Sequence, residues 1–483
     1  MELDRMSESE GAIGPLQTSA VFKQLKISPI KALYPYYNST NINLAGGIPL
    51  ESCFPFNSLK VNLDAEDGDG DGDSFTLTKG SDLALNYHSS DGLPPVKAWV
   101  HSHVQELHAP PFSFDVSLTV GATDAWFKVL QLLHTECVLF DEYVYASSIT
   151  YVYASSITPC TTAGIKAIGI ESDAEGMKPA SIRAATLRAR GAGLVVNILY
   201  LIPVGQNPTG LTMSQARKGE IYSLCGELDL IIVEDDAYYY LHYPDGQTAG
   251  LDHLPPSLLS MDVDGRVIRI DTVSKIISPG MRLGWVSGPP DFIAKFVLLQ
   301  GQSNQFPSSI AQSIFLGLVQ HWGRDGLNAH IRQLQLFYKS QRDVFCAAIE
   351  EHFQPGLCVY STPQGGMFLW LTFPTLRVTT WELFEALAAV DVIVVPGTGF
   401  HVPAVEAVIS GEIGGEGGGS GRAVPCVPCV RACYAAVGAE RIVQAAQSMA
   451  ACVLRLHSEH AEHLEHLKNL EDLESSSGGL RQR

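Results

Sequence analysis

The stretch Asp271-Thr-Val-Ser-Lys-Ile-Ile-Ser-Pro-Gly-Met-Arg-Leu-Gly-Trp285 holds one lysine, Lys275, among small hydroxyl residues, with Arg282 seven residues later. Desolvation or a nearby cation lowers the pKa of a lysine amine, which can then form a Schiff base with a carbonyl compound at neutral pH. Hydroxyl groups and an arginine can together bind a phosphate group. By itself the stretch also fits a turn after a strand at 267–272 with an ordinary surface lysine. Other parts of the sequence are needed to choose between a reactive and an ordinary lysine.

The composition is that of an ordinary globular protein. The chain has 483 residues, of which 46% are hydrophobic and 17% charged, enough for a sizeable core. A net charge of −19 argues against a nucleic-acid partner, since phosphate neutralisation requires clustered Lys and Arg. No apolar run approaches the roughly 20 residues of a membrane span, and the acidic N-terminus is unlike a signal or transit peptide. We therefore expect a cytoplasmic protein without a membrane partner.

Two motifs imitate metal sites. Residues 64–74 place acidic side chains at alternate positions, but the twelfth position counted from Asp67 is Thr78 and not the bidentate Glu of a calcium loop. We predict a solvated acidic loop there. Cys426 and Cys429 form one CxxC without a second ligand pair. The ten cysteines fit buried or free thiols better than a disulfide framework, and no metal is expected.

From residue 96 onward, helical and strand-like patterns alternate. Helical periodicity covers 96–107 and 122–133, and a strand pattern covers 114–120. Further short apolar runs bounded by turns occupy 137–140, 165–170, 194–201 and 230–234. Such alternation predicts an α/β fold with a mainly parallel sheet covered by helices on both faces, and with ligands at the carboxyl ends of the strands.

The chain divides into four regions. We expect an N-terminal arm at 1–45, a large domain at 46–326, a smaller α+β C-terminal domain at 327–455 and a charged tail at 456–483. In the small domain we predict helices at 327–353, 381–390 and from 439, with strands at 357–360, 367–372, 392–395 and 427–434. Seven glycines within 411–421 indicate a flexible insertion. Residues 143–150 repeat identically as 151–158, a local tandem duplication.

Three strand ends carry polar motifs. Asn207-Pro-Thr-Gly210 makes a turn whose Asn can donate to an oxyanion or phenolate. Asp236 and Tyr239 can address opposite sides of one planar ring, and a buried carboxylate beside a ring nitrogen keeps that nitrogen protonated. Residues 119–124 open a helix whose N-terminus can bind phosphate, although Asp124 adds a negative charge unless it points away or caps the helix.

In this order and spacing, the motifs resemble fold type I pyridoxal-phosphate aminotransferases, nearest to the fungal aromatic and the kynurenine/α-aminoadipate aminotransferases. The same resemblance extends over about residues 28–455. Further runs that carry it are Leu44-Ala-Gly-Gly-Ile-Pro49, Leu85-Asn-Tyr87, Glu234-Asp-Asp-Ala-Tyr-Tyr-Tyr-Leu241 and Gly365-Gly-Met-Phe-Leu-Trp370. The resemblance implies a large domain with a seven-stranded-type, mainly parallel sheet, a smaller C-terminal domain, pyridoxal 5′-phosphate as cofactor and a homodimer.

The resemblance also implies a role for each motif residue. Lys275 would bind the cofactor aldehyde covalently and transfer the proton, and Asp236 would pair with the ring nitrogen. Tyr239 and Asn207 would contact the ring oxygen O3′, and Tyr87 would reach the phosphate held by the partner subunit. The remaining phosphate contacts would come from Ala122, Thr123, Thr272, Ser274 and Arg282.

Arg431 would bind the substrate α-carboxylate, with Gly47 and Asn207 lining that pocket. The ring-stacking aromatic falls in the duplication. Continuity with the preceding strand favours Tyr145, and proximity to the following helix favours Tyr153. The implied reaction moves an amino group from an aromatic or α-aminoadipate-like amino acid to a 2-oxo acid such as 2-oxoglutarate, in a paralogue that could serve a specialised pathway. The alternatives are another pyridoxal-phosphate reaction, such as decarboxylation or elimination, and a catalytically weak regulatory paralogue.

Overall fold

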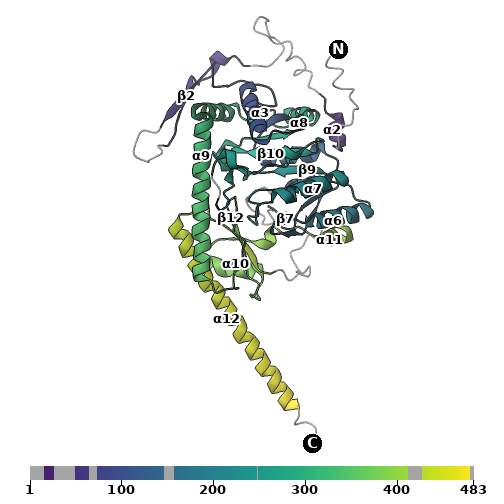
Figure 1. Cartoon of the computed structure of the whole chain (residues 1–483), viewed down its shortest axis with the longest axis vertical. Coiled ribbons are helices and arrows are strands. Elements are labelled where there is room, and N and C mark those ends of the chain that lie inside the picture. The colour runs from purple at the N-terminus through teal and green to yellow at the C-terminus, as the bar shows by residue number, and fades with distance from the viewer. Residues whose placement is uncertain are drawn as a thin grey trace.

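The protein is seen here in a computed structural model that describes residues 16–26, 49–64, 73–145, 157–246, 249–411 and 427–478, without the side chains of 157–158 and 460–478. Its central element is a seven-stranded sheet (Figure 1). In spatial order the strands are β3 (Asp115–Thr119), β11 (Gly284–Gly288), β10 (Val267–Thr272), β9 (Ile231–Asp235), β8 (Val196–Leu201), β4 (Cys137–Asp141) and β5 (Lys166–Ile170). Only the pairs made by β11 are antiparallel. The predicted α/β class with a mainly parallel sheet is confirmed.

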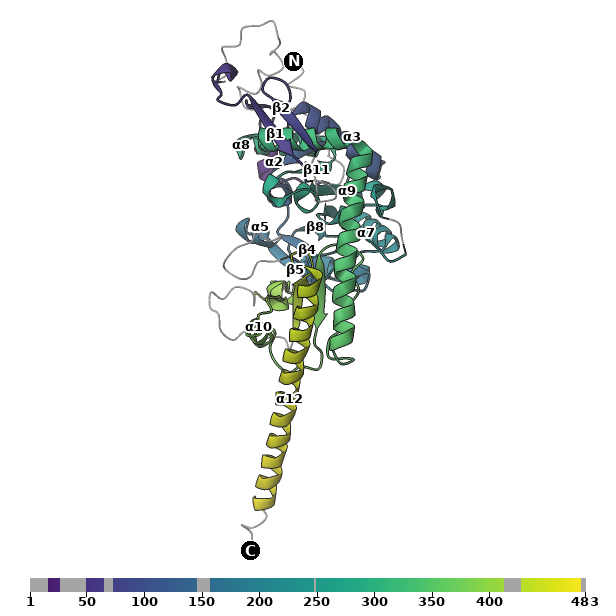
Figure 2. The ribbon, with the colours of Figure 1, turned by 90° about the vertical axis from the view of Figure 1, so that its left-hand side faces the viewer.

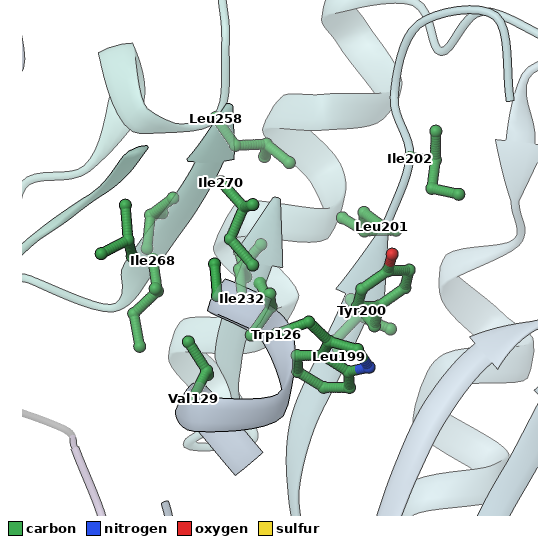
Figure 3. Close-up of a cluster of buried hydrophobic side chains, with 14 of the residues drawn as sticks. Trp126, Val129, Leu199, Tyr200, Leu201, Ile202, Ile232, Leu258, Ile268 and Ile270 are labelled. Carbon is green, nitrogen blue, oxygen red and sulfur yellow. The ribbon is translucent and has the colours of Figure 1, made fainter. Parts of the chain in front are cut away.

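Helices pack against this sheet, so that β4, β8, β10 and β11 bury every one of their residues. Strands covered on both faces are mainly apolar, as β4 is, whereas β10 also buries Arg269 and Asp271. The helices of this part are α2 (Ala20–Gln24), α3 (Pro94–His108), α4 (Ala122–Leu132), α5 (Ile157–Thr162), α6 (Pro179–Gly191), α7 (Gln215–Glu227), α8 (Pro290–Gln302) and α11 (Val405–Ser410). Figure 3 shows Trp126 and Val129 of α4 in one cluster with Tyr200, Ile232 and Ile268 of the sheet. Full burial of each such side chain contributes about 1.5–3 kcal/mol.

A second sheet lies toward the C-terminus and has a hydrophobic cluster of its own, from Phe345 to Val453. Its strands, in spatial order, are β12 (Phe368–Thr372), β14 (Cys429–Cys433) and β13 (Val395–Pro396). Its helices are α9 (Ser309–His352), α10 (Thr380–Ala388) and α12 (Ala439–Gly478). Helix α9 packs against α12, whose C-terminal part extends away from the body (Figures 1 and 2).

Three predictions for this part were wrong in extent. Helix α9 begins 18 residues before the expected start at 327, with non-helical backbone only at Gly323 (φ 61°), because the helix also packs against α3 and the strand at 74–78. Residues 357–360 form no strand, only a single bridge from Val359 to Thr372. The strand expected at 392–395 is only two residues long and lies at Val395–Pro396.

Several predicted features lie outside the described residues. These are most of the N-terminal arm (1–15 and 27–45), most of the acidic loop (65–72), most of the duplication (146–156) and nearly all of the Gly-rich insertion (412–421). The acidic loop is flanked by an antiparallel hairpin of β1 (Ser58–Asn62) and β2 (Ser74–Thr78), and a second short hairpin joins β6 (Ser172–Asp173) to β7 (Gly176–Met177). Within the described ranges, no helix is both long enough and apolar enough to cross a membrane.

Candidate active site

A cavity of about 560 Å³ lies at the carboxyl ends of β8, β9 and β10, beside the N-terminus of α4, and is closed on one side by β12 and β14. This is where an open α/β sheet is expected to bind its ligand. Nine of the residues selected from the sequence line it together: Ala122, Thr123, Tyr145, Asn207, Thr272, Ser274, Lys275, Arg282 and Arg431.

Lys275 ends a short 3-10 helix, Val273–Lys275, that directly follows β10. Thr272 caps this helix, and its Oγ1 accepts a hydrogen bond from the backbone N–H of Ser274 at 3.2 Å. Burial lowers the pKa of the Lys275 ammonium, and the positive charges of Arg282 and Arg431 lower it further, while Cys433 acts in the opposite direction. A lysine in such surroundings is neutral more often than a surface lysine and is a better nucleophile toward a carbonyl carbon.

An anion cradle is formed by the start of α4 and by Arg282. The first N–H groups of a helix have no partner within the helix and attract anions. Arg282 lies beside them, with Nη1 donating to Ser274 Oγ at 3.4 Å and Nη2 donating to the carbonyl oxygen of Val120 at 3.3 Å. Gly121 caps α4 with φ +79°, and a Cβ there would lie 2.7 Å from Arg282 Nη2. The close approach of the arginine to the helix start therefore requires glycine at this position.

The carboxylate that faces the cavity is Asp235, one residue before the predicted Asp236. Side chains alternate along a strand, and Glu234 and Asp236 lie on the other face, with carboxylate oxygens 3.1 and 3.4 Å from Nη1 of the buried Arg269. Asp235 Oδ2 accepts a 2.5 Å hydrogen bond from Tyr200 Oη. Its Oδ1 is buried without a hydrogen-bond partner among the described residues. Asp236, predicted from the sequence to face the ligand, does not line the cavity, and its carboxylate pairs with the buried Arg269 instead.

The tyrosine after β9 that lines the cavity is likewise one residue before the predicted one: it is Tyr238 and not Tyr239. Tyr239 does not line the cavity: its ring lies 4.5 Å from the Arg269 guanidinium, and its hydroxyl donates to the carbonyl oxygen of Pro255 at 3.0 Å. Tyr238 lines the cavity, and its hydroxyl accepts a 3.3 Å hydrogen bond from Asn207 Nδ2. The sequence contains two overlapping Asp-x-x-Tyr matches, and only the fold distinguishes them.

Arg431 projects from β14 into the cavity from the second sheet. Its Nη1 donates to Asn207 Oδ1 at 2.7 Å, and its guanidinium carbon lies 4.3 Å from the ring centre of Phe368 and 4.9 Å from that of Phe400. Its Nε is buried without a partner in the described part of the chain, and burial lowers the pKa of the guanidinium. A guanidinium with an unused donor, held between two rings, suits a carboxylate ligand.

The remaining selected residues are placed less centrally. Tyr145, from the first copy of the duplication, lines the cavity, while Tyr153 and Gly47 lie outside the described residues. Tyr87 is 58% exposed, its ring 6.0 Å from that of Phe306, and it does not line the cavity.

Besides Asp235 and Tyr238, the residues that line the cavity but were not predicted from the sequence include Trp126, Tyr200, Ile202, Ala237 and Pro279. For Tyr200 the available signal was a hydroxyl-bearing side chain in an otherwise apolar strand run.

Comparisons with known proteins agree with this geometry. The family model for aminotransferase class I and II matches residues 84–449. The aromatic amino acid aminotransferase C569.07 of Schizosaccharomyces pombe is 31% identical over 72% of this chain and 79% of its own length. The mitochondrial kynurenine/alpha-aminoadipate aminotransferase of Rattus norvegicus is 32% identical over 78% of this chain and 88% of its own length. The crystal structure of the aminotransferase Aro8 from Candida albicans superposes with a TM-score of 0.78 at 25% identity, covering 91% of this chain and 98% of that one. This chain belongs to the aminotransferase class I and II family.

Proposed function

We propose that this aminotransferase uses pyridoxal 5′-phosphate to move the amino group of an aromatic or α-aminoadipate-like amino acid to 2-oxoglutarate. Enzymes of the family use this cofactor, and relatives at 31–32% identity are named for aromatic amino acids and for kynurenine and α-aminoadipate. The observation that carries the proposal is one cavity that combines the low-pKa lysine Lys275, the unpartnered carboxylate oxygen of Asp235 and the guanidinium of Arg431.

The residues present fit this cofactor. A buried carboxylate oxygen without a partner, Asp235 Oδ1, suits a protonated ring nitrogen. The start of α4 with Arg282, Ser274 and Thr272 suits a phosphate group. Tyr238 and Asn207 line the cavity in hydrogen-bond contact with each other, and they would donate to a ring oxygen in the roles that the sequence suggested for Tyr239 and Asn207.

Each residue then has a task in the reaction. When bound, pyridoxal phosphate takes up the amino group and the electrons released at the substrate Cα. Lys275 would hold the cofactor through its aldehyde group, and its amine, once free, would move the proton released at the substrate Cα. Asp235 would keep a ring nitrogen protonated. Arg431, oriented by Asn207, binds the α-carboxylate of the amino acid.

Retention of the carboxylate favours transamination over decarboxylation. A guanidinium that binds the α-carboxylate through two N–H groups stabilises the group that a decarboxylase must expel. We further propose a homodimer in which the exposed Tyr87 contributes to the site of the neighbouring subunit, and Tyr145 as the aromatic side chain that stacks on the cofactor ring. A cytoplasmic location stays a prediction, since relatives include enzymes named mitochondrial.

Borohydride reduction tests the cofactor assignment. The purified protein is saturated with pyridoxal phosphate, reduced and digested, and the expected result is a pyridoxyl label on the peptide that contains Lys275, absent in Lys275→Ala. Without a label at Lys275 the proposal fails.

A panel of amino donors tests the substrate class. Phenylalanine, tyrosine, tryptophan, kynurenine and α-aminoadipate are each added alone, and loss of the cofactor band at ~420 nm is followed. If none of these amino acids removes the band but another amino acid does, the protein is an aminotransferase whose donors are not the proposed ones.

A further inference from the structure

We propose that Lys128 and Asp124 form a positioning pair for the cofactor phosphate, in which Lys128 neutralises a carboxylate that would otherwise repel that phosphate. The inference rests on the proposed function, because it concerns how this chain receives the phosphorylated cofactor. Neither residue lines the cavity, so both act through the start of α4.

The pair resolves an electrostatic conflict at the anion cradle. Asp124 lies in the first turn of α4, directly after Thr123, where the helix N-terminus and Arg282 favour an anionic ligand. A carboxylate at this position binds the same partial charges as the phosphate and repels it. The positive charge of Arg282 alone would be cancelled by Asp124, and a second cation restores a net positive cradle.

Lys128 supplies that cation from inside the protein. Its Nζ lies 2.5 and 2.6 Å from the two carboxylate oxygens of Asp124, one helical turn earlier on the same face. The Lys128 side chain is only 2% exposed, against 24% for Asp124. Solvent screens such a pair less than a surface pair, so that its Coulomb attraction is larger. Burial lowers the pKa of Lys128, and the charge of Asp124 acts in the opposite direction.

The same pair fixes the backbone that carries the cradle. Asp124 Oδ2 accepts a 3.0 Å hydrogen bond from the N–H of Val120, whose carbonyl oxygen accepts from Arg282 Nη2 at 3.3 Å. Val120 is therefore held from both sides, just before the Gly121 turn. Lys128 Nζ also donates to Gln300 Oε1 at 3.2 Å, and Gln300 Nε2 donates to the carbonyl oxygen of Leu118 at 2.8 Å, next to the end of β3.

The test compares pyridoxal 5′-phosphate with pyridoxal, which lacks the phosphate. The full-length chain is freed of cofactor, and the dissociation constant of each ligand is measured by quenching of protein fluorescence. For Lys128→Met we expect affinity for pyridoxal phosphate to fall roughly ten-fold or more, because Asp124 is left uncompensated in a partly buried site. Affinity for pyridoxal should change less than three-fold.

A double variant separates charge from packing. In Asp124→Asn/Lys128→Met both charges are removed, and we expect most of the lost affinity for pyridoxal phosphate to return. Asp124→Asn alone keeps an oxygen that can accept from Val120 and should bind the cofactor at least as tightly as the wild type. This single variant decides the question if Lys128→Met does not fold, and a ten-fold loss in it would overturn the inference.

The matched control is Lys339→Met, which removes an i,i+4 partner of Asp343 at 2.8 Å on α9, remote from the cradle. It should leave the ratio of the two dissociation constants unchanged. An equal loss for both ligands in Lys128→Met, or no recovery in the double variant, would show a merely structural role and overturn the inference. Absence of pyridoxal phosphate binding by the wild type would instead overturn the proposed function itself.

Discussion

Tyr200 Oη donates a 2.5 Å hydrogen bond to Oδ2 of Asp235, and the other oxygen of this buried carboxylate has no partner among the described residues. Burial raises the pKa of Asp235 to about 6, and the bond from Tyr200 acts in the opposite direction. The ring centres of Trp126 and Phe140 lie 4.8 and 5.1 Å from that of Tyr200 (Figure 3 shows Trp126 beside it). An aromatic wall thus orients the hydroxyl, and the hydroxyl leaves one carboxylate oxygen for a ligand.

Replacement of Tyr200 by Phe should weaken this arrangement. Loss of the donor removes a hydrogen bond that lowers the pKa of Asp235, so we expect that pKa to rise above about 6. Cofactor affinity and kcat/KM should each fall roughly ten-fold, for a bond to a charged group worth about 1.5 kcal/mol. Titration of the cofactor-free protein with pyridoxal phosphate between pH 5 and 8 measures the effect. Tyr243→Phe is the control: its buried hydroxyl donates to the Gly366 carbonyl oxygen at 2.6 Å outside the cavity, and only stability should change.

Two isosteric variants test whether Asp235, and not Asp236, is the carboxylate that acts in the cavity. Asp235→Asn should lower kcat about a hundred-fold, the size typical of removing a group that stabilises charge in the transition state. Asp236→Asn should retain cofactor binding and most activity, but should lower the free energy of unfolding by about 2 kcal/mol, because buried Arg269 loses a charged partner. Steady-state kinetics and urea unfolding of both variants give the comparison. The reverse ranking in kcat would restore Asp236 as the catalytic carboxylate.

Substitution of Arg431 by Lys keeps the charge and removes the planar pair of donors. We expect KM for the amino acid to rise roughly 10- to 100-fold, since a hydrogen bond to a charged group is worth about 1.5–3 kcal/mol. The 2-oxo acid should be affected equally, because it carries the same carboxylate, and cofactor affinity should not change. Initial rates for both substrates decide the point, and an unchanged KM would move the carboxylate site elsewhere.

His103 should make the protein less stable in acid. Burial lowers its pKa to about 4, and the positive charges of Arg324 and Arg269 also lower it, while the negative charge of Glu106 raises it. Between pH 6.5 and 4 the unfolded chain binds a proton that the folded chain excludes, so stability falls as the pH falls through this window. The loss amounts to about 3 kcal/mol at 1.36 kcal/mol per pKa unit.

Urea midpoints of wild type and His103→Gln, measured from pH 7 to 4, test this expectation. The variant should lose less stability on acidification, because glutamine can still bond to Tyr240, which lies 2.9 Å from His103 Nε2. Carboxyl groups with a raised pKa, such as Asp141 with a pKa of about 7, instead add stability as the pH falls. They do so equally in the wild type and the variant, so their effect cancels when the two proteins are compared. Parallel pH curves would refute the assignment.

Local sequence determined the fold class and most of the cavity. Buried parallel strands are mainly apolar, and the polar turns that follow them meet at one edge of the sheet, so the sequence alone groups Asn207, Thr272 and Lys275. The Gly121 turn and the helix after it likewise predict an anion site, because the start of a helix is set by residues close together in the sequence.

Only the tertiary structure decided which of two adjacent residues faces the ligand. Asp235 and Asp236 are alike in sequence, and their directions depend on Arg269, which lies 33 positions after Asp236 and comes close only through the pairing of β9 with β10. The same holds for Tyr238 against Tyr239, for Tyr200, and for Lys128 beside Asp124 and Gln300. Side-chain direction in a buried network is set by where the opposite charges can be paired, and that depends on contacts between distant segments.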